Sequence, residues 1–230
     1  MPRSLLLALD TGSPTVSVAL ARDGALVAER AIAMERSSVQ LLGLIRDVLD
    51  EAGARPADLT GAVALRGPGS FTGLRIGLAT VLGFHQALGV PATALETLCV
   101  LAAGSRVRLI AVVDALRGDW SAQAFTSGSV PEALGEPVLI PGPDLPALAA
   151  GAAAGIVTGF GVSRLAETPG WPADLRLVEA GPLAAAAARL AAEPATVWDP
   201  SLLTAPLYAR PPAVTLPRAR RTVQGEPALR

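Results

Sequence analysis

The sequence predicts an α/β protein built from two similar halves. The first hundred of its 230 residues follow the order β-β-β-α-β-α-β-α. The second half opens on the same unit as the first, a strand, an Asp-containing turn and a second strand. A chain of this length can bury a substantial core. We therefore expect an N-terminal lobe over residues 1–103, a C-terminal lobe over 104–210 and a poorly ordered tail over 211–230.

Three strands open the first lobe. Leu5–Leu9 is an apolar run, and Val16–Leu20 alternates with a period of two. Asp23-Gly24 is a hairpin signal before Ala25–Ile32. Together these signals predict an antiparallel three-stranded meander.

Helices and single strands then alternate. Ser37 or Ser38 can cap a helix that ends before Gly53, and its apolar stripe is wider than one sheet contact needs. A second helix, Leu74–Leu88, is expected to stop at Gly89. The remaining predicted elements of this lobe are a strand at Ala62–Leu65, a strand at Val90–Leu95 and a short helix at Glu96–Ala103.

The second lobe has weaker signals. Strands are expected at Arg108–Val113, Trp120–Thr126, Val138–Ile140, Ile156–Phe160 and Leu175–Val178, with helices at Leu145–Ala150 and Leu183–Ala192. The tail lacks periodicity and is rich in Pro and Arg. Its basic residues are either solvated or able to contact a phosphate backbone.

Composition excludes several chemistries. The chain has no lysine, which rules out Schiff-base chemistry and a Walker A lysine. With one histidine (His85) and one cysteine (Cys99), it cannot form a multi-His or multi-Cys zinc site or a disulfide framework. His85 is expected to be structural, and Cys99 a buried inert thiol. Neither a secretory signal nor a membrane span is recognised, so a soluble, cytoplasmic protein is expected.

Two turns are candidates for binding nucleotide. Asp10, Thr11, Gly12 and Ser13 offer backbone N–H groups, hydroxyls and a carboxylate, which can hold phosphate or hydrated Mg²⁺. Asp114 begins the corresponding turn of the second half. That turn, Asp114–Arg117, has neither glycine nor hydroxyl, so tight hairpins are the favoured interpretation and weak nucleotide binding is expected.

A glycine-rich segment from Gly67 to Gly77 is the most unusual stretch. Three of its glycines recur every fourth residue and form a stripe without side chains, which allows close approach of another backbone. That backbone belongs either to this chain or to a partner. The partner hypothesis predicts an interface that combines this segment with the preceding helix: Leu41, Leu44, Ile45, Val48, Gly69, Phe71, Thr72, Gly73, Leu74 and Gly77.

These motifs resemble those of the TsaB (YeaZ) family of the TsaD/glycoprotease-like superfamily. The resemblance rests on Leu7–Thr11, Val16–Leu20, Gly67–Gly77, Val113–Asp119 and Pro206–Arg210. It implies a two-lobed fold of the actin, sugar-kinase and Hsp70 type, with duplicated ribonuclease H-like lobes. One departure is the segment Arg36-Ser37-Ser38, where family members often have histidine.

The resemblance also implies a function. It is that of a non-catalytic subunit that pairs with TsaD, in a complex that includes TsaE and uses ATP and Mg²⁺. This complex threonylcarbamoylates N6 of adenosine 37 in tRNAs that read codons starting with A. Contact with tRNA is expected to be indirect, a homodimer is expected in the absence of TsaD, and no cofactor or membrane partner is assigned to this chain.

Two other functional classes remain as alternatives. TsaD-type enzymes carry a His-x-x-x-His metal pair, which falls here on Thr97 and Leu101, so neither a metal site nor catalytic residues are expected. A small-molecule kinase or ATPase of the same fold is the main alternative and would need a phosphate clamp and a catalytic acid. A peptidase is disfavoured, because the chain has a single histidine, His85, and lacks the metal pair.

Overall fold

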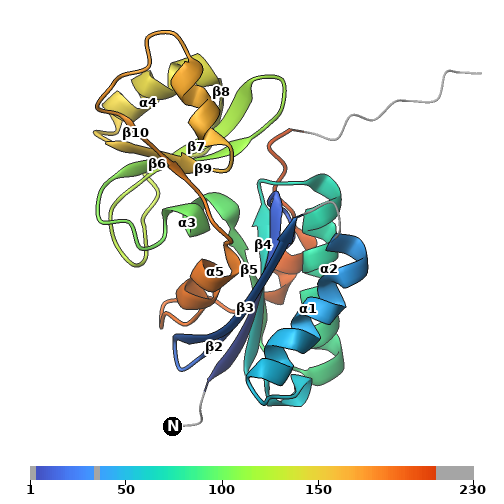
Figure 1. Ribbon diagram of the computed structural model, residues 1–230. Helices are drawn as coiled ribbons and strands as arrows, with labels where there is room; N and C mark the ends of the chain where they lie inside the picture. The colour runs from blue at the N-terminus through green and yellow to red at the C-terminus, as the bar shows by residue number, and fades with distance from the viewer. Residues whose placement is uncertain (1–3, 34–36, 211–230) are drawn as a thin grey trace, which may run out of the picture.

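The computed structural model describes residues 4–33 and 37–210, in two lobes joined by a helix (Figure 1). The expected tail lies outside these ranges. Each lobe contains one five-stranded mixed sheet. The first sheet comprises β1 (Leu5–Asp10), β2 (Thr15–Arg22), β3 (Ala25–Ala33), β4 (Gly61–Gly67) and β5 (Ala92–Glu96). The second comprises β6 (Leu109–Asp114), β7 (Asp119–Phe125), β8 (Val138–Pro141), β9 (Ile156–Gly159) and β10 (Arg176–Glu179).

The two sheets have the same topology. The first runs in the order β3-β2-β1-β4-β5, with β1, β2 and β3 antiparallel and β4 and β5 parallel to β1. The second runs β10-β9-β6-β7-β8, with β6, β7 and β8 antiparallel and β9 and β10 parallel to β6. This duplication confirms the two-lobed α/β fold of duplicated ribonuclease H-like lobes.

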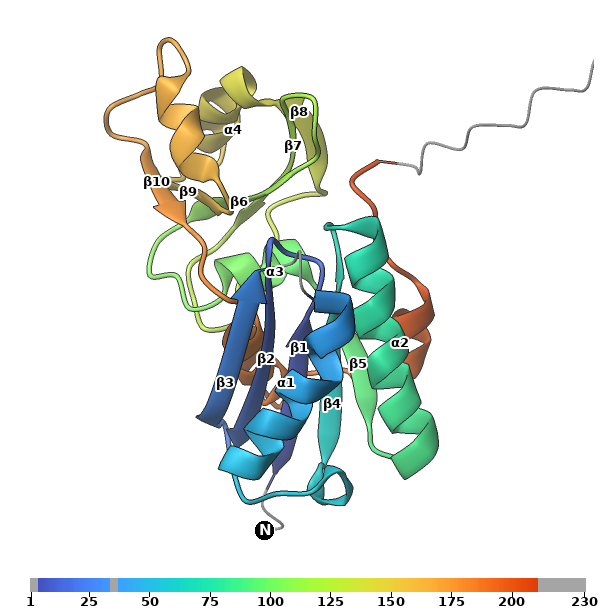
Figure 2. The same cartoon turned by 45° about the vertical axis from the view of Figure 1, so that its right-hand side comes forward.

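Helices cover both faces of the first sheet. α1 (Ser37–Glu51) and α2 (Phe71–Leu88) pack on one face, and α3 (Thr97–Ala102) and α5 (Ala184–Ala191) on the other. Figure 2 shows α1 and α2 side by side across the first of these faces. The apolar stripe of α1 is buried against the sheet, and β3 also contacts this helix. Contacts within the lobe therefore account for the width of the stripe.

The long helix α2 has clear boundary signals. The Ser70 hydroxyl accepts a hydrogen bond from the Gly73 N–H (3.3 Å) at its start. Gly89 ends it in a left-handed conformation (φ 68°), and its N–H donates to the carbonyl of His85. The helix therefore ends at Leu88 as predicted, but it begins at Phe71, three residues before the predicted start at Leu74.

α3 joins the lobes. Val100 packs beneath the first sheet, whereas Leu98 and Ala102 pack with Leu109 and Phe125 of the second. The other face of the second sheet is covered by α4 (Leu145–Gly151) and by the 3₁₀ segment η4 (Val162–Glu167). A single short helix thus belongs to two cores.

The C-terminal part of the described chain returns to the first lobe. The expected boundary placed all of 104–210 in the second lobe, but α5 packs on β1 and β2, and η5 (Pro200–Thr204) packs on α2 and β5. The physical reason is the alanine-rich face of α5, which lies flat against the small residues Ala8, Ala19 and Ala21. The chain still forms two lobes, but α5 and η5 belong to the first lobe and not to the second.

None of the helices in the described ranges combines the length with the apolar composition that crossing a bilayer requires.

Ser17 of β2 anchors the returning helix. Its buried hydroxyl accepts a hydrogen bond from the Ala184 N–H (3.1 Å), at the start of α5. We expect Ser17→Ala to lower the free energy of unfolding by about 1–3 kcal/mol, because a buried N–H loses its partner. Urea unfolding measures this, with the exposed Ser129→Ala as the control. Equal stability of the two variants would refute this role.

Candidate functional site

The turn between β1 and β2 is closed on itself. Asp10, Thr11 and Ser13 are all buried. The N–H groups of Gly12 and Ser13 both donate to Asp10 Oδ1, at 3.0 and 3.2 Å. These are donors that a phosphate would need, so the turn satisfies its own backbone instead of presenting it to a ligand.

The N-terminus of α2 packs directly on this turn. The Ser70 N–H donates to the Gly12 carbonyl (2.8 Å), and the Thr11 hydroxyl donates to the Gly73 carbonyl (2.7 Å). A Cβ on Gly69 would lie 2.8 Å from the Gly12 oxygen. A Cβ on Gly73 or Gly77 would fall well inside contact distance of a Thr11 oxygen. The glycine stripe is therefore a packing surface within this chain.

Burial dominates the electrostatics of Asp10. It raises the pKa of the Asp10 carboxyl from 3.8 to about 6, and the hydrogen bonds from Ser13 and Gly12 act in the opposite direction. The second carboxylate oxygen, Oδ2, is buried and has no hydrogen-bond partner among the described residues. Burying the ionised carboxylate of Asp10 therefore lowers the stability of the folded state.

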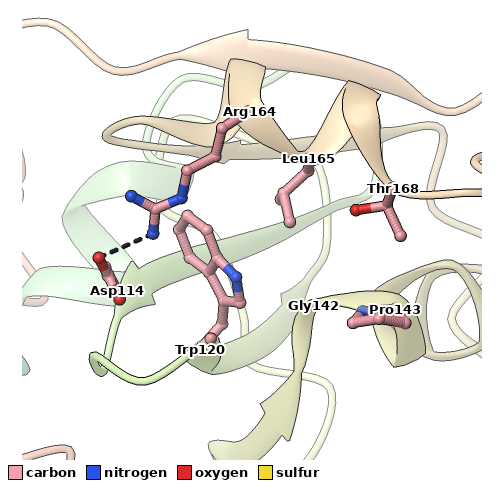
Figure 3. A pocket seen from close by; sticks show the side chains of 8 residues that line it. Asp114, Trp120, Gly142, Pro143, Arg164, Leu165 and Thr168 are labelled. Atoms are coloured by element: carbon pink, nitrogen blue, oxygen red, sulfur yellow. Dashed lines mark ion pairs between the residues drawn. The ribbon is translucent and has the colours of Figure 1, made fainter.

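The second turn contains a salt bridge (Figure 3). Asp114, at the end of β6, pairs with Arg164 of η4 (2.7 Å), and its other oxygen accepts from the Leu116 N–H (2.7 Å). The Arg164 guanidinium lies over the Trp120 ring, 4.4 Å from its centroid. These residues line a cavity of about 400 Å³. Arg164 and Trp120 were missed by the sequence reasoning, because their contact depends on the fold of the second lobe.

Neither turn fits a nucleotide–magnesium complex. Asp10 is enclosed and its neighbouring N–H groups are used, while the charge of Asp114 is compensated by Arg164. Within the described ranges, no three His, Cys, Asp or Glu side chains gather as a metal site would require. The five residues predicted to bind nucleotide are thus in place at the two turns but are committed to internal contacts.

A C-terminal segment bridges the two lobes. The Leu207 N–H donates to the Arg66 carbonyl (2.6 Å), and the Tyr208 ring stacks on Phe71 at 4.9 Å. Arg210 donates through Nε to the Ala115 carbonyl (3.0 Å) and forms an ion pair with Asp119. The Pro-x-Tyr-x-Arg motif thus ties the start of α2 to the second turn.

The predicted partner interface must be revised. Four of its residues lie on the inner face of α1 and are buried in the core of the first lobe: Leu41, Leu44, Ile45 and Val48. Gly73, Leu74 and Gly77 are also buried, Gly69 is half-buried, and only Phe71 and Thr72 of the predicted set are exposed. Leu42, which the sequence reasoning left out of the interface, is 70% exposed. The helical spacing of apolar residues predicted the apolar face of α1 correctly, but it did not show that the chain's own sheet covers this face.

The remaining sequence candidates lie in structural positions. His85 Nδ1 lies 2.9 Å from the Val90 carbonyl oxygen, near the end of α2. Cys99 is half-buried, and burial, with the Glu96 charge, raises the pKa of its thiol. Thr97 and Leu101 pack within α3, Thr97 being buried.

Comparison with known proteins gives a consistent assignment. A family model described as "TsaD: tRNA N6-adenosine threonylcarbamoyltransferase" matches residues 29–137. The solved structure "YeaZ from Pseudomonas aeruginosa" is 29% identical and superposes with a TM-score of 0.69, covering 82% of this chain and 90% of that chain. The chain is similar to proteins of the TsaB (YeaZ) family in both sequence and fold.

Curated proteins named TsaB match over a shorter stretch of the chain. The "tRNA threonylcarbamoyladenosine biosynthesis protein TsaB" of Escherichia coli (strain K12) is 32% identical over 119 residues, which is 50% of this chain and 52% of that protein. The protein of the same name from Bacillus subtilis (strain 168) is 33% identical over 102 residues, 44% of each chain. The chain spans about half the length of the curated relatives it matches.

Asp10 predicts a pH-dependent stability. Because its pKa is raised in the folded chain, the folded state holds the proton more tightly than the unfolded state does. The free energy of unfolding should therefore fall by about 3 kcal/mol as pH rises from about 4 to about 6. Asp10→Asn keeps an oxygen acceptor for the two N–H groups, so we expect it to reduce this slope and to be more stable at neutral pH. Urea unfolding across this pH range measures the effect, with the exposed Asp50→Asn as the control. An unchanged slope in Asp10→Asn would contradict the assignment.

The glycine contact predicts opposite effects of two substitutions on one helix. Gly73→Ala places a methyl group against the Thr11 carbonyl and should cost at least about 2 kcal/mol of stability. At Gly83 nothing lies within 4 Å of an added Cβ, so Gly83→Ala should stabilise by about 0.5–1 kcal/mol. Urea unfolding of both variants is the test. If Gly73→Ala is as stable as the unmodified chain, the close packing of the stripe is wrong.

Proposed function

We propose that this chain is a non-catalytic partner subunit in the formation of threonylcarbamoyladenosine in tRNA. In this proposal it pairs with TsaD in a complex that also uses TsaE, ATP and Mg²⁺. The complex modifies N6 of adenosine 37 in tRNAs that read codons starting with A. The names of the curated relatives support the process, and the match to the TsaD model supports the kinship with the transferase.

The closed first turn is the observation that carries the proposal. A transferase or kinase of this fold needs polar groups that point into the cleft, but here Gly12, Ser13 and Asp10 bind one another. Thr97 and Leu101, which stand at the positions of the transferase metal pair, are packed in α3. These features favour a contribution through surface contacts, and they disfavour the alternative of a small-molecule kinase or ATPase.

The outward faces of α1 and α2 are the proposed partner surface. This face is rich in small and apolar side chains. It includes the exposed Leu42, Thr72 and Ala79, and Gly43 and Gly83, which have open space around them. Figure 1 shows the two helices on the side of the sheet opposite α3 and α5. Small residues allow close helix–helix approach, and TsaD and a second copy of this chain would compete for the same face.

Reconstitution tests the proposal. We expect no modified tRNA from the isolated chain, and formation of threonylcarbamoyladenosine only when TsaD, TsaE, ATP, threonylcarbamoyl-adenylate and this chain are combined. Nucleoside analysis of the tRNA by mass spectrometry measures the product. Product formed by this chain alone, or formed equally well without it, would refute the proposed role.

Leu42→Asp tests the surface itself. A carboxylate at this exposed apolar position should weaken both self-association and TsaD binding by about tenfold or more, without loss of thermal stability. Light scattering and calorimetric titration with TsaD measure the two associations. Leu116→Asp is the matched control, because Leu116 is 71% exposed on the second lobe. Unchanged association of Leu42→Asp would move the interface away from α1.

A further inference from the structure

A second cavity lies between the lobes, away from the two turns. Its volume is about 400 Å³, and its lining comes from β4 and β5, from α3, from β7 with the loop after it, and from residues 195–202. It lies beside α3, the helix that lies between the lobes in Figure 1. This size is in the range of small-molecule sites. Neither the closed turns nor the proposed partner surface uses it.

The cavity lining contains one charge of each sign. Arg66 and Glu96 form an ion pair through Nη2 and Oε1, with side chains 17% and 40% exposed. This contact uses one guanidinium nitrogen and one carboxylate oxygen, which leaves Nη1 and Oε2 for a ligand of complementary charges. Much of the remaining lining is apolar, including Leu95, Phe125 and Leu202.

Two further polar atoms of the lining residues have unmet hydrogen-bonding capacity. The Thr93 hydroxyl belongs to a residue that is only 1% exposed, and the Nε of Arg66 is buried as well. Neither has a hydrogen-bond partner among the described residues. Buried polar groups are rarely left in this state, which marks this side of the cavity as polar.

We propose that this inter-lobe cavity binds a free α-amino acid with an aliphatic side chain. The ligand carboxylate would accept hydrogen bonds from Arg66, and the ligand ammonium would donate to Glu96. The side chain would lie against Leu95, Phe125 and Leu202. A zwitterion fits because its two charges are one atom apart, as the paired charges of the site require, and because its net charge of zero leaves the ion pair balanced.

Cys99 provides a direct readout of occupancy. It is the only cysteine in the chain and it lines this cavity. Alkylation with N-ethylmaleimide at mildly alkaline pH, followed by mass spectrometry, reports its accessibility. We expect L-leucine at millimolar concentration to slow alkylation at least tenfold. Glycine should protect less because it lacks the apolar contact.

Ligand analogues test the charge recognition on the unmodified chain. Leucinamide lacks the carboxylate and 4-methylpentanoate lacks the ammonium, so neither should protect Cys99. Equal protection by either analogue and by L-leucine would overturn the proposed recognition. An alkylation rate that no amino acid changes would overturn the site itself.

Two variants complete the test. Glu96→Gln has nearly the same shape, and we expect it to abolish protection by L-leucine, measured as the ratio of alkylation rates with and without ligand. That ratio corrects for the direct effect of the Glu96 charge on the Cys99 thiol. Arg164→Gln is the matched control, because it breaks the ion pair in the other cavity of about 400 Å³ and should leave protection unchanged. Full protection in Glu96→Gln would contradict the proposal.

Discussion

The contact between the first β-turn and the N-terminus of α2 is the constraint on which the rest of the structure depends. Gly69, Gly73 and Gly77 let the helix approach until its backbone exchanges hydrogen bonds with Thr11 and Gly12. This packing stabilises the first lobe, but it also encloses Asp10 and uses the polar groups of the turn. The turn between β1 and β2, whose residue types could bind phosphate, is therefore part of the core.

Contacts within the chain also join the two lobes. Each half ends in a helix that crosses to other partners: α3 packs beneath both sheets, and α5 returns to the first. The segment ending at Arg210 then fixes the second turn to the start of α2. The two turns are therefore held by contacts within the chain, and the surfaces that we propose for function are the outward helix faces and the cavity beside α3.

Local patterns in the sequence predicted most of the fold. Alternation in β2, the hairpin at Asp23-Gly24 and the end of α2 at Gly89 are short-range signals, and the structure confirms them. The return of α5 could not be predicted, because no local pattern indicates which sheet its alanine face will cover.

The candidate site was less predictable. The sequence identified the glycine stripe but left open which backbone it meets, because the spacing of glycines does not identify their neighbour. It also assigned Leu41 and Val48 to a partner surface, although β3 and the sheet below bury them. The pairing of Asp114 with Arg164 joins residues 50 positions apart, which no local pattern reveals.

Because the polar groups of both turns are committed to internal contacts, we propose that the isolated chain has no nucleotide site. Isothermal titration calorimetry with ATP in the presence of Mg²⁺ tests this most directly. We expect no saturable heat of binding for the chain alone, under conditions in which its fold is intact. A tight site with one nucleotide per chain would contradict it.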